Sequence, residues 1–249
     1  MLAMLVVLVA LGGWQLYTVA GGVDKLILPA PTDVAASLWD DRALLWSNFA
    51  VTAREMAVGL LLAVILGVLL AAALHLSRTS RRALYPVLIA SQTVPIVLIA
   101  PLLVAWFGYG LTPKVLIVAL VCFFPVVVPV LAALGAADPA QRKLMASLGA
   151  TPWQRLRLLE APGALPALFT GARLAVAVGA IAAVLAETAG SEAGLGHLML
   201  QSIPQLETAR AFAAVVVLSA FSLGLYIALT LAQRRLTAWA PHSTEGLLT

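Results

Sequence analysis

The sequence predicts an all-α membrane protein with six transmembrane helices, from its composition and from the spacing of its apolar runs. Hydrophobic residues make up 62% of the 249 residues, charged residues only 10%, and the mean hydropathy is +1.03. A soluble domain has about 25% charged residues. Apolar runs of about 20 residues recur along the chain, each long enough as a helix to cross about 30 Å of hydrocarbon. We therefore expect one transmembrane domain over residues 1–249 and no soluble enzyme domain beside it.

Six apolar runs are the predicted spans. The first covers 1–20; a signal peptide is the alternative, but the run lacks a basic leader and an A-x-A cleavage pattern. A surface helix over 34–49 is expected after the LPAPTDV turn, and a compact basic loop over 75–85. The remaining spans are predicted at about 51–74, 86–107, 114–134, 165–188 and 211–233.

A polar segment, residues 138–166, separates the fourth and fifth spans. Asp138-Pro139 and Thr151-Pro152 each resemble a helix N-cap followed by proline at the first helical position. Gly149 ends the first of these helices. Two amphipathic helices joined by a glycine turn favour a docking element for a partner protein over the alternative, a solvated loop. The residues expected to contact the partner are Arg142, Lys143, Leu144, Met145, Leu148, Gly149, Ala150, Trp153 and Arg155.

The basic residues predict which side of the membrane each loop faces. One set of loops and the tail carry Arg78, Arg81, Arg82, Arg142, Lys143, Arg155, Arg157, Arg234 and Arg235. The opposite loops carry only Lys25, Arg42, Lys114 and Arg210. Because basic residues are enriched in cytoplasmic loops, both termini and the 138–166 loop are expected in the cytoplasm.

Polar residues inside the spans are the candidates for a substrate pathway, since groups that must hydrogen-bond are costly against lipid. These are Ser91, Gln92, Thr93 and Glu187. The alternative for Ser91 and Thr93 is a hydroxyl bonded to its own helix. For Glu187 it is a charge at the membrane edge that reaches water or pairs across the bundle. The lone Cys122 and the isolated His75, His197 and His242 are poor metal ligands, and no metal site is expected.

The stretch LMASLGATPWQRLRLLEAPGALPALFTGARLA resembles the cytoplasmic signature loop of permease subunits of binding-protein-dependent ABC importers. That pattern runs E-A-A, three residues, Gly, about nine residues, then a hydrophobic residue and L-P. Gly149 takes the glycine place and Leu165-Pro166 the closing pair, whereas Lys143-Leu144-Met145 stands where E-A-A would. LPAPTDV, WFGYGLTPKV, FFPVVVPVL and AETAGSEAGLGHL are similar to the nitrate, sulfonate, taurine and thiamine-precursor branch. Within that branch, 91–126 is most similar to permeases for hydroxymethylpyrimidine-type thiamine precursors.

The resemblance implies a bacterial inner-membrane permease whose transporting core covers about 51–235. Its 138–166 loop would be the coupling element that inserts into a cytoplasmic ABC ATPase. The chain has no G-x-x-x-x-G-K-[ST] phosphate loop, so ATP and Mg would be used by that partner, with no cofactor on this chain. An extracytoplasmic substrate-binding protein would meet 190–210 and 34–49. One coupling loop per chain favours a homodimer. Membrane lipid is the remaining partner, and nothing indicates nucleic acid.

The predicted substrate is a pyrimidine-like thiamine precursor, hydrogen-bonded by Gln92 and Thr93 near Trp106 or Phe107. Sulfonate, taurine or nitrate is the alternative; such anions call for cations in the spans, where only Arg54 and Arg173 were available, near the ends. A membrane protease would need a nucleophile–base pair or H-E-x-x-H, which the sequence lacks. A secondary transporter would show repeated halves and interior charge pairs. A membrane scaffold leaves the two-helix loop unexplained.

Overall fold

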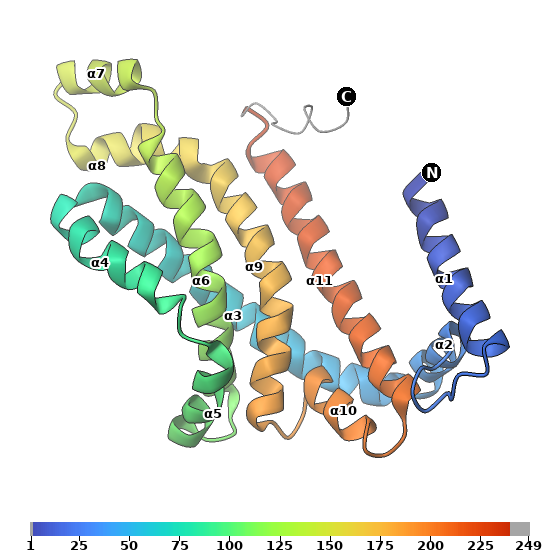
Figure 1. The fold of residues 1–249 in the computed structure, drawn as a ribbon. Helices are drawn as coiled ribbons and strands as arrows, with labels where there is room; N and C mark the ends of the chain where they lie inside the picture. The colour runs from blue at the N-terminus through green and yellow to red at the C-terminus, as the bar shows by residue number, and fades with distance from the viewer. Residues whose placement is uncertain (1, 240–249) are drawn as a thin grey trace.

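The computed structural model describes residues 2–239, and all regular structure in that range is helical (Figure 1). The helices are α1 (Leu2–Ala20), α2 (Pro31–Asp40), α3 (Arg42–Leu76), α4 (Arg78–Ser91), α5 (Ile96–Phe107), α6 (Leu111–Gly135), α7 (Pro139–Ser147), α8 (Pro152–Arg155), the π-helix η1 (Leu156–Glu160), α9 (Ala161–Gly190), α10 (Leu195–Ser202) and α11 (Thr208–Leu236). Met1, at the start of the predicted first span, and His242 lie outside the described residues.

Four helical stretches are long and apolar enough to cross a membrane: α3, α6, Pro152–Gly190 and α11. The bent pair of α4 and α5 makes a fifth if it is counted as one span. The apolar helix α1 is shorter than these, so the count of six spans stays a prediction. The end of α11 and the first turns of α1 point to the same end of the bundle as α7 and α8 (Figure 1).

Small residues let α3, α6 and α9 pack closely at the centre of the bundle. A Cβ added at Gly59 of α3 would lie 2.6 Å from the Cβ of Val118 in α6. At Gly171 of α9, an added Cβ would lie 2.6 Å from the carbonyl oxygen of Pro125 and 3.0 Å from the Cα of Val126. Small residues that allow backbones to approach are typical of helix interfaces in membranes. These three helices form the frame on which the loops at both ends are held.

We expect Gly171→Ala to destabilise the bundle, although Gly→Ala inside a helix usually stabilises by about 1 kcal/mol. The new methyl group would meet α6 backbone atoms, which cannot rotate away. Overpacking of this kind costs about 1–3 kcal/mol. The purified protein should therefore melt about 5 °C lower, as measured by thermal unfolding in detergent. The control is Gly135→Ala, where a Cβ meets nothing within 4 Å; equal melting temperatures for the two variants would contradict the packing argument.

The predicted third span, 86–107, is broken rather than continuous. α4 ends at Ser91 and α5 begins at Ile96, and their axes differ by 97°. Pro95 precedes α5 in an extended conformation, and proline disfavours a helical conformation in the residue before it. Of the prolines in this stretch, Pro95 lies at the break, whereas Pro86 and Pro101 lie inside α4 and α5 without ending them.

The basic loop predicted over 75–85 is also wrong, because helices occupy almost all of it. α3 continues to Leu76, and α4 begins at Arg78. Between them Ser77 caps α4, its hydroxyl oxygen accepting a hydrogen bond from the backbone N–H of Ser80 at 3.1 Å. Serine is a favoured N-cap, so the HLSRTS stretch carried a helix-start signal that the cluster of arginines obscured.

The structure does not contain the predicted surface helix over 34–49 and the separate predicted span over 51–74. The boundary between the two helices of this region lies earlier in the chain. α2 ends at Asp40, and α3 runs unbroken from Arg42. The sequence offers no proline or glycine between Asp41 and Gly59 to end a helix. Arg54 and Glu55 therefore lie a dozen residues inside α3, about 18 Å from its start, and not in the first turn of a span.

An ion pair joins the beginning of α3 to the beginning of α11. Nη2 of Arg210 lies 3.0 Å from Oδ1 of Asp41, whose other oxygen accepts a hydrogen bond from Ser37 at 2.7 Å. Burial raises the pKa of Asp41, but these hydrogen bonds and the arginine charge outweigh it, so the pKa is lowered. A lowered folded-state pKa means that this contribution to stability is lost as the pH falls through that value.

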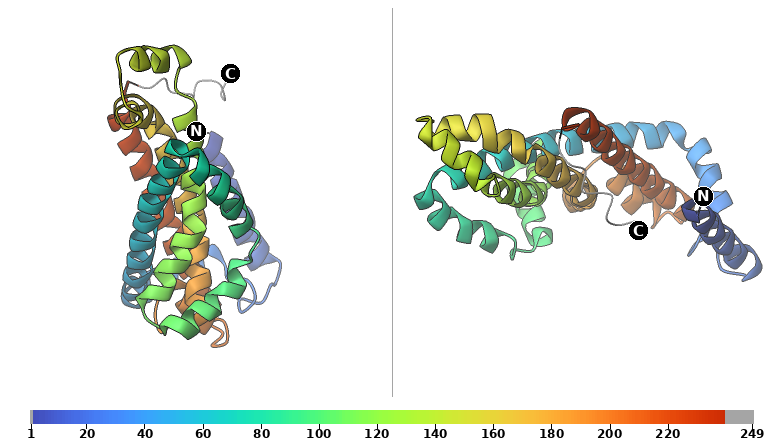
Figure 2. Two further views of the ribbon diagram at one scale, coloured as in Figure 1. Left: turned by 90° about the vertical axis from the view of Figure 1, so that its left-hand side faces the viewer. Right: turned by 90° about the horizontal axis from the view of Figure 1, so that it is seen from above.

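The helix α1 lies at one edge of the bundle, beside α2 and the beginning of α11 (Figures 1 and 2). The rings of Trp14 and Phe212 are 5.9 Å apart, and the Gln15 amide donates to the Thr32 hydroxyl at 3.2 Å. Most of its other side chains are exposed, so α1 adds little to the core.

Candidate functional site

The 138–166 loop stands out from one end of the bundle as two helices joined by a tight turn (Figures 1 and 2). Asp138 caps α7 by accepting the N–H of Ala140, and Thr151 and Gln154 form a capping box at the start of α8. Gly149 has a φ of +77°, which favours glycine. The predicted caps and glycine turn are therefore confirmed. The second helix is not a short separate one, since α8 continues through η1 into α9.

Large apolar side chains are exposed on this loop. Leu144 is 60% exposed, Leu148 76% and Trp153 61%, all close to the Gly149 turn. Lys143 is exposed, and Met145, Ala150 and Arg155 are half-buried. An exposed apolar patch with a basic rim is typical of a protein interaction site. The structure thus brings together the residues that the sequence singled out.

Arg142 is the exception, because its guanidinium points into the protein. Its Nη2 donates to the carbonyl oxygen of Leu134 at 2.6 Å, and its Nε lies 2.9 Å from Oε1 of Glu160. The second carboxylate oxygen of Glu160 lies 2.7 Å from Nε2 of His75. Glu160 is buried, and its carboxylate joins α7 to the end of α3, while Arg142 itself bonds to the end of α6. Sequence reasoning did not single out Glu160 or His75 for this contact.

The predicted pathway residues around Ser91 lie at the break between α4 and α5. Ser91 and Gln92 line a hollow of about 410 Å³ whose other walls are mostly apolar, including Ile96, Leu120 and Phe123. The Ser91 and Thr93 hydroxyls donate to carbonyls of their own helix, those of Leu88 and Ala90, each at 2.8 Å. That arrangement is the alternative considered for both residues.

The aromatic residue of this hollow is Phe123. Trp106 and Phe107, which were expected near Gln92, lie at the far end of α5, about 15 Å from its first residue. Of the pathway residues predicted at the break, Gln92 is thus the one whose side chain has no bond to a backbone carbonyl among the described residues.

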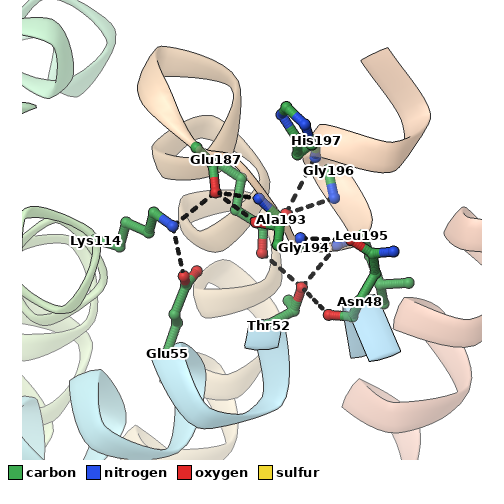
Figure 3. A network of polar contacts seen from close by, with 11 residues as sticks. Asn48, Thr52, Glu55, Lys114, Glu187, Ala193, Gly194, Leu195, Gly196 and His197 are labelled. Carbon is green, nitrogen blue, oxygen red and sulfur yellow. Dashed lines mark hydrogen bonds and ion pairs between the residues drawn. The ribbon is translucent and has the colours of Figure 1, made fainter. Parts of the chain in front are cut away.

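Glu187 lies apart from that hollow and inside the protein, where it is 1% exposed (Figure 3). Its Oε1 accepts a hydrogen bond from the Thr52 hydroxyl at 2.5 Å. Its Oε2 accepts the backbone N–H of Gly196 at 2.5 Å and that of His197 at 3.3 Å. The carboxylate therefore caps the beginning of α10 and joins it to α3, so the side chain pairs across the bundle.

Two further residues of α3 hold the same segment. Asn48 Oδ1 accepts the N–H of Gly194, and Thr52 Oγ1 accepts the N–H of Leu195, both at 2.8 Å. Asn48, Thr52 and Glu55 follow one another at four and three residues, so they share one face of the helix. This polar stripe on an apolar helix was a signal in the sequence that was missed.

A buried ion pair lies beside this network. Nζ of Lys114 is 3.0 Å from Oε1 of Glu55 and donates to the Ser191 hydroxyl at 2.6 Å (Figure 3). Lys114, predicted in a loop, lies in the first turn of α6 and is 5% exposed. Glu187, predicted to be a pathway residue, is bonded to Thr52 and to the beginning of α10.

Among the described residues, no group of three or more metal-ligating side chains gathers in one place. His75 contacts Glu160, and His197 uses its backbone N–H toward Glu187. These contacts hold the 138–166 loop in place, leave an apolar patch exposed on it and line hollows between helices. Such features fit a membrane pathway whose opening is coupled to a partner protein.

Comparison with known proteins gives the family. Residues 63–238 match the family described as binding-protein-dependent transport system inner membrane component. A probable ABC transporter permease protein of Haemophilus influenzae is 37% identical over 91% of this chain and 92% of its own length. The formylaminopyrimidine transport permease protein of Halalkalibacterium halodurans is 31% identical over 86% of each chain. The taurine transport system permease protein of Escherichia coli is 33% identical over 87% of this chain and 82% of its own.

A solved structure shows the same fold. The crystal structure of an amino acid ABC transporter with histidines has a TM-score of 0.62, covers 80% of this chain and 97% of that chain, and is 20% identical. ABC permeases are transport components that work with an ATPase and a substrate-binding protein. From the matched residues and the identities, the chain belongs to the family of binding-protein-dependent inner-membrane components, the permease subunits of ABC importers.

Proposed function

We propose that this chain forms the substrate path of an ATP-driven importer and couples to a separate ATPase through the 138–166 loop. The observation that carries the proposal is the exposed apolar turn around Gly149, tied by Glu160 to the end of α3 and by Arg142 to the end of α6. A partner that grips Leu148 and Trp153 would move α7 and α8 as a unit. The Glu160 and Arg142 contacts would pass that movement to two spans. Arg142 acts inside this unit, and Lys143 and Arg155 form its polar rim.

The same proposal requires two copies of the chain, because one loop engages one ATPase subunit and an ATPase pair closes around ATP and Mg. A twofold homodimer in the bacterial inner membrane supplies the second loop, with both termini in the cytoplasm. The binding protein would deliver substrate at the opposite end of the bundle, where α5 and α10 lie (Figure 1).

Gly149→Leu tests the coupling proposal. A side chain at a φ of +77° strains the turn by about 1–2 kcal/mol and changes the angle between α7 and α8. We expect normal membrane insertion but at least tenfold weaker stimulation of ATP hydrolysis by loaded binding protein in proteoliposomes. Gly135→Leu is the control, since position 135 is exposed and φ there is not positive. Unchanged stimulation in Gly149→Leu would refute docking through this turn.

The substrate we propose is a pyrimidine-like thiamine precursor or related small heterocycle. The relative that transports formylaminopyrimidine supports it, and Gln92 offers both a donor and an acceptor in an otherwise apolar hollow. Taurine or another sulfonate is the second candidate, supported by the taurine permease and by Arg54 and Lys114 inside α3 and α6. Binding of an aminopyrimidine, taurine, an alkyl sulfonate and nitrate to the purified partner binding protein separates these candidates.

A further inference from the structure

A second hollow, of about 470 Å³, lies at the end of the bundle opposite the 138–166 loop. Its walls come from α3, from the turn before α6 and the first residues of α6, and from the segment after α9. The residues that line it are Ala50, Val51, Arg54, Glu55, Tyr109, Gly110, Leu111, Lys114, Glu192 and Ala193. Four of the ten are acidic or basic: Arg54 and Lys114 are basic, and Glu55 and Glu192 are acidic. So polar a lining is unusual for a surface between membrane spans.

One atom in this lining points to a ligand. Glu55 is 1% exposed, and its Oε1 is 3.0 Å from Nζ of Lys114. Its Oε2 is buried and accepts no hydrogen bond from a donor among the described residues, and the carboxyl of Glu187 lies beside this side chain. A buried carboxylate oxygen without a donor is costly, so a donor that enters the hollow is bound strongly there. Nζ of Lys114 already contacts Glu55 Oε1 and the Ser191 hydroxyl, so Lys114 is a fixed part of the wall of the hollow.

The exposed residues of the hollow favour a face that meets water or protein over one that meets lipid. Arg54 and Glu192 are exposed, and Arg54 lies a dozen residues inside α3 without an ion-pair partner within residues 2–239. An arginine on a span that faced hydrocarbon would be expensive. This side of α3 therefore faces water or the second copy of the chain, as the wall of a pathway does.

We propose that this hollow is the receiving site for the transported molecule. Glu55 Oε2 accepts an N–H from an amino group of that molecule, and the Arg54 guanidinium donates to a neighbouring acceptor or acid group. The class of substrate is a small molecule that carries an amino group beside a hydrogen-bond acceptor. The amino edge of an aminopyrimidine and the two ends of an aminosulfonate both meet this requirement. Nitrate and simple alkyl sulfonates lack the donor. The inference rests on the proposed function and narrows its substrate.

The test uses the purified permease–ATPase complex in lipid nanodiscs, without the binding protein, and two matched pairs of probes. These are 4-aminopyrimidine with 4-methylpyrimidine, and taurine with propanesulfonate. We expect the amino member of one pair to bind about tenfold tighter than its match, as one hydrogen bond to a charged group implies. The pair whose two members bind with different affinities shows which class of molecule, an aminopyrimidine or an aminosulfonate, supplies the amino group. Glu55→Gln should abolish the preference, and Glu207→Gln, at an exposed residue outside the hollow, should retain it.

Equal binding within both pairs, or an undiminished preference in a folded Glu55→Gln complex, would overturn the receiving site. If Glu55→Gln fails to fold because Lys114 loses its partner, Arg54→Gln decides, since Arg54 is exposed. It should weaken the preferred probe about tenfold, and unchanged binding would refute the site. Stimulation of ATP hydrolysis by loaded binding protein is measured in the same wild-type complex. Its absence would refute the proposed function, whereas its presence with no preference between probes would refute this inference alone.

Discussion

Glu160→Gln should abolish most of the stimulation of ATP hydrolysis by loaded binding protein, while the permease–ATPase complex stays assembled. The amide keeps the shape of the side chain but removes the charge that faces both Arg142 and His75. Removal of one partner from a buried charged contact costs several kcal/mol, and the partial exposure of Arg142 reduces this to about 1–3 kcal/mol. The 138–166 loop would then move without moving the end of α3. We expect at least tenfold loss of stimulation by loaded binding protein, with unstimulated hydrolysis retained.

The split between stimulated and unstimulated hydrolysis distinguishes coupling from folding, because a merely unfolded permease would lose both. Glu207→Gln is the matched control, since Glu207 is exposed and its one ionic contact, to Arg210, is 3.9 Å long. A His75→Ala variant removes only one of the two partners and should show a smaller loss. If Glu160→Gln retains full stimulation, Glu160 only stabilises the loop, and the path of coupling to α3 proposed here is wrong.

The 138–166 loop was predictable because its signals are local. Caps, a proline at the first helical position and a glycine turn act within a few residues, and the structure places α7, Gly149 and α8 where those signals indicated. The apolar side chains exposed there were also evident, since no neighbouring span was needed to explain them.

The polar contacts between helices were not predictable in the same way. Lys114 sits in the first turn of α6, where a membrane-edge charge is usual, and only the packing of α3 against α6 brings Glu55 to it. Glu187 is separated from Thr52 by 135 positions. The polar stripe of Asn48, Thr52 and Glu55 on α3 indicated that this face was buried against protein, but no pattern in one chain identified the partners.

The break between α4 and α5 was predictable only in part. The predicted span over 86–107 contains Pro95, Pro101 and the polar Ser91, Gln92 and Thr93, yet a proline inside a membrane helix often produces only a kink because neighbours satisfy the freed carbonyl. The 97° bend depends on how α5 packs against α6 and α9. Pro95 therefore marks the position of the break in the sequence, but the angle follows from packing.

Gly194→Ala should strongly destabilise the protein. Gly194 has a φ of +125° and a ψ of 161°, a conformation open almost only to glycine, and an added Cβ would lie 2.3 Å from Cδ of Glu187. Backbone strain of this kind costs about 1–3 kcal/mol. The carboxylate must also leave, so it loses the N–H groups of Gly196 and His197 and the Thr52 hydroxyl. We expect the melting temperature of the purified protein to fall by on the order of 10 °C.

The control is Gly163→Ala, a helical position where an added Cβ meets nothing within 4 Å. It should melt at or above the wild-type temperature, because alanine favours a helix over glycine by about 1 kcal/mol. Glu187→Gln tests the same network from the other side. The amide has one acceptor oxygen in place of two, and its NH₂ would face backbone N–H groups that need acceptors. It should lower the melting temperature by several degrees, at about 1–3 kcal/mol for an unsatisfied buried donor. If Gly194→Ala and Gly163→Ala have the same melting temperature, the hydrogen bonds that join α3, α9 and α10 do not stabilise this end of the permease.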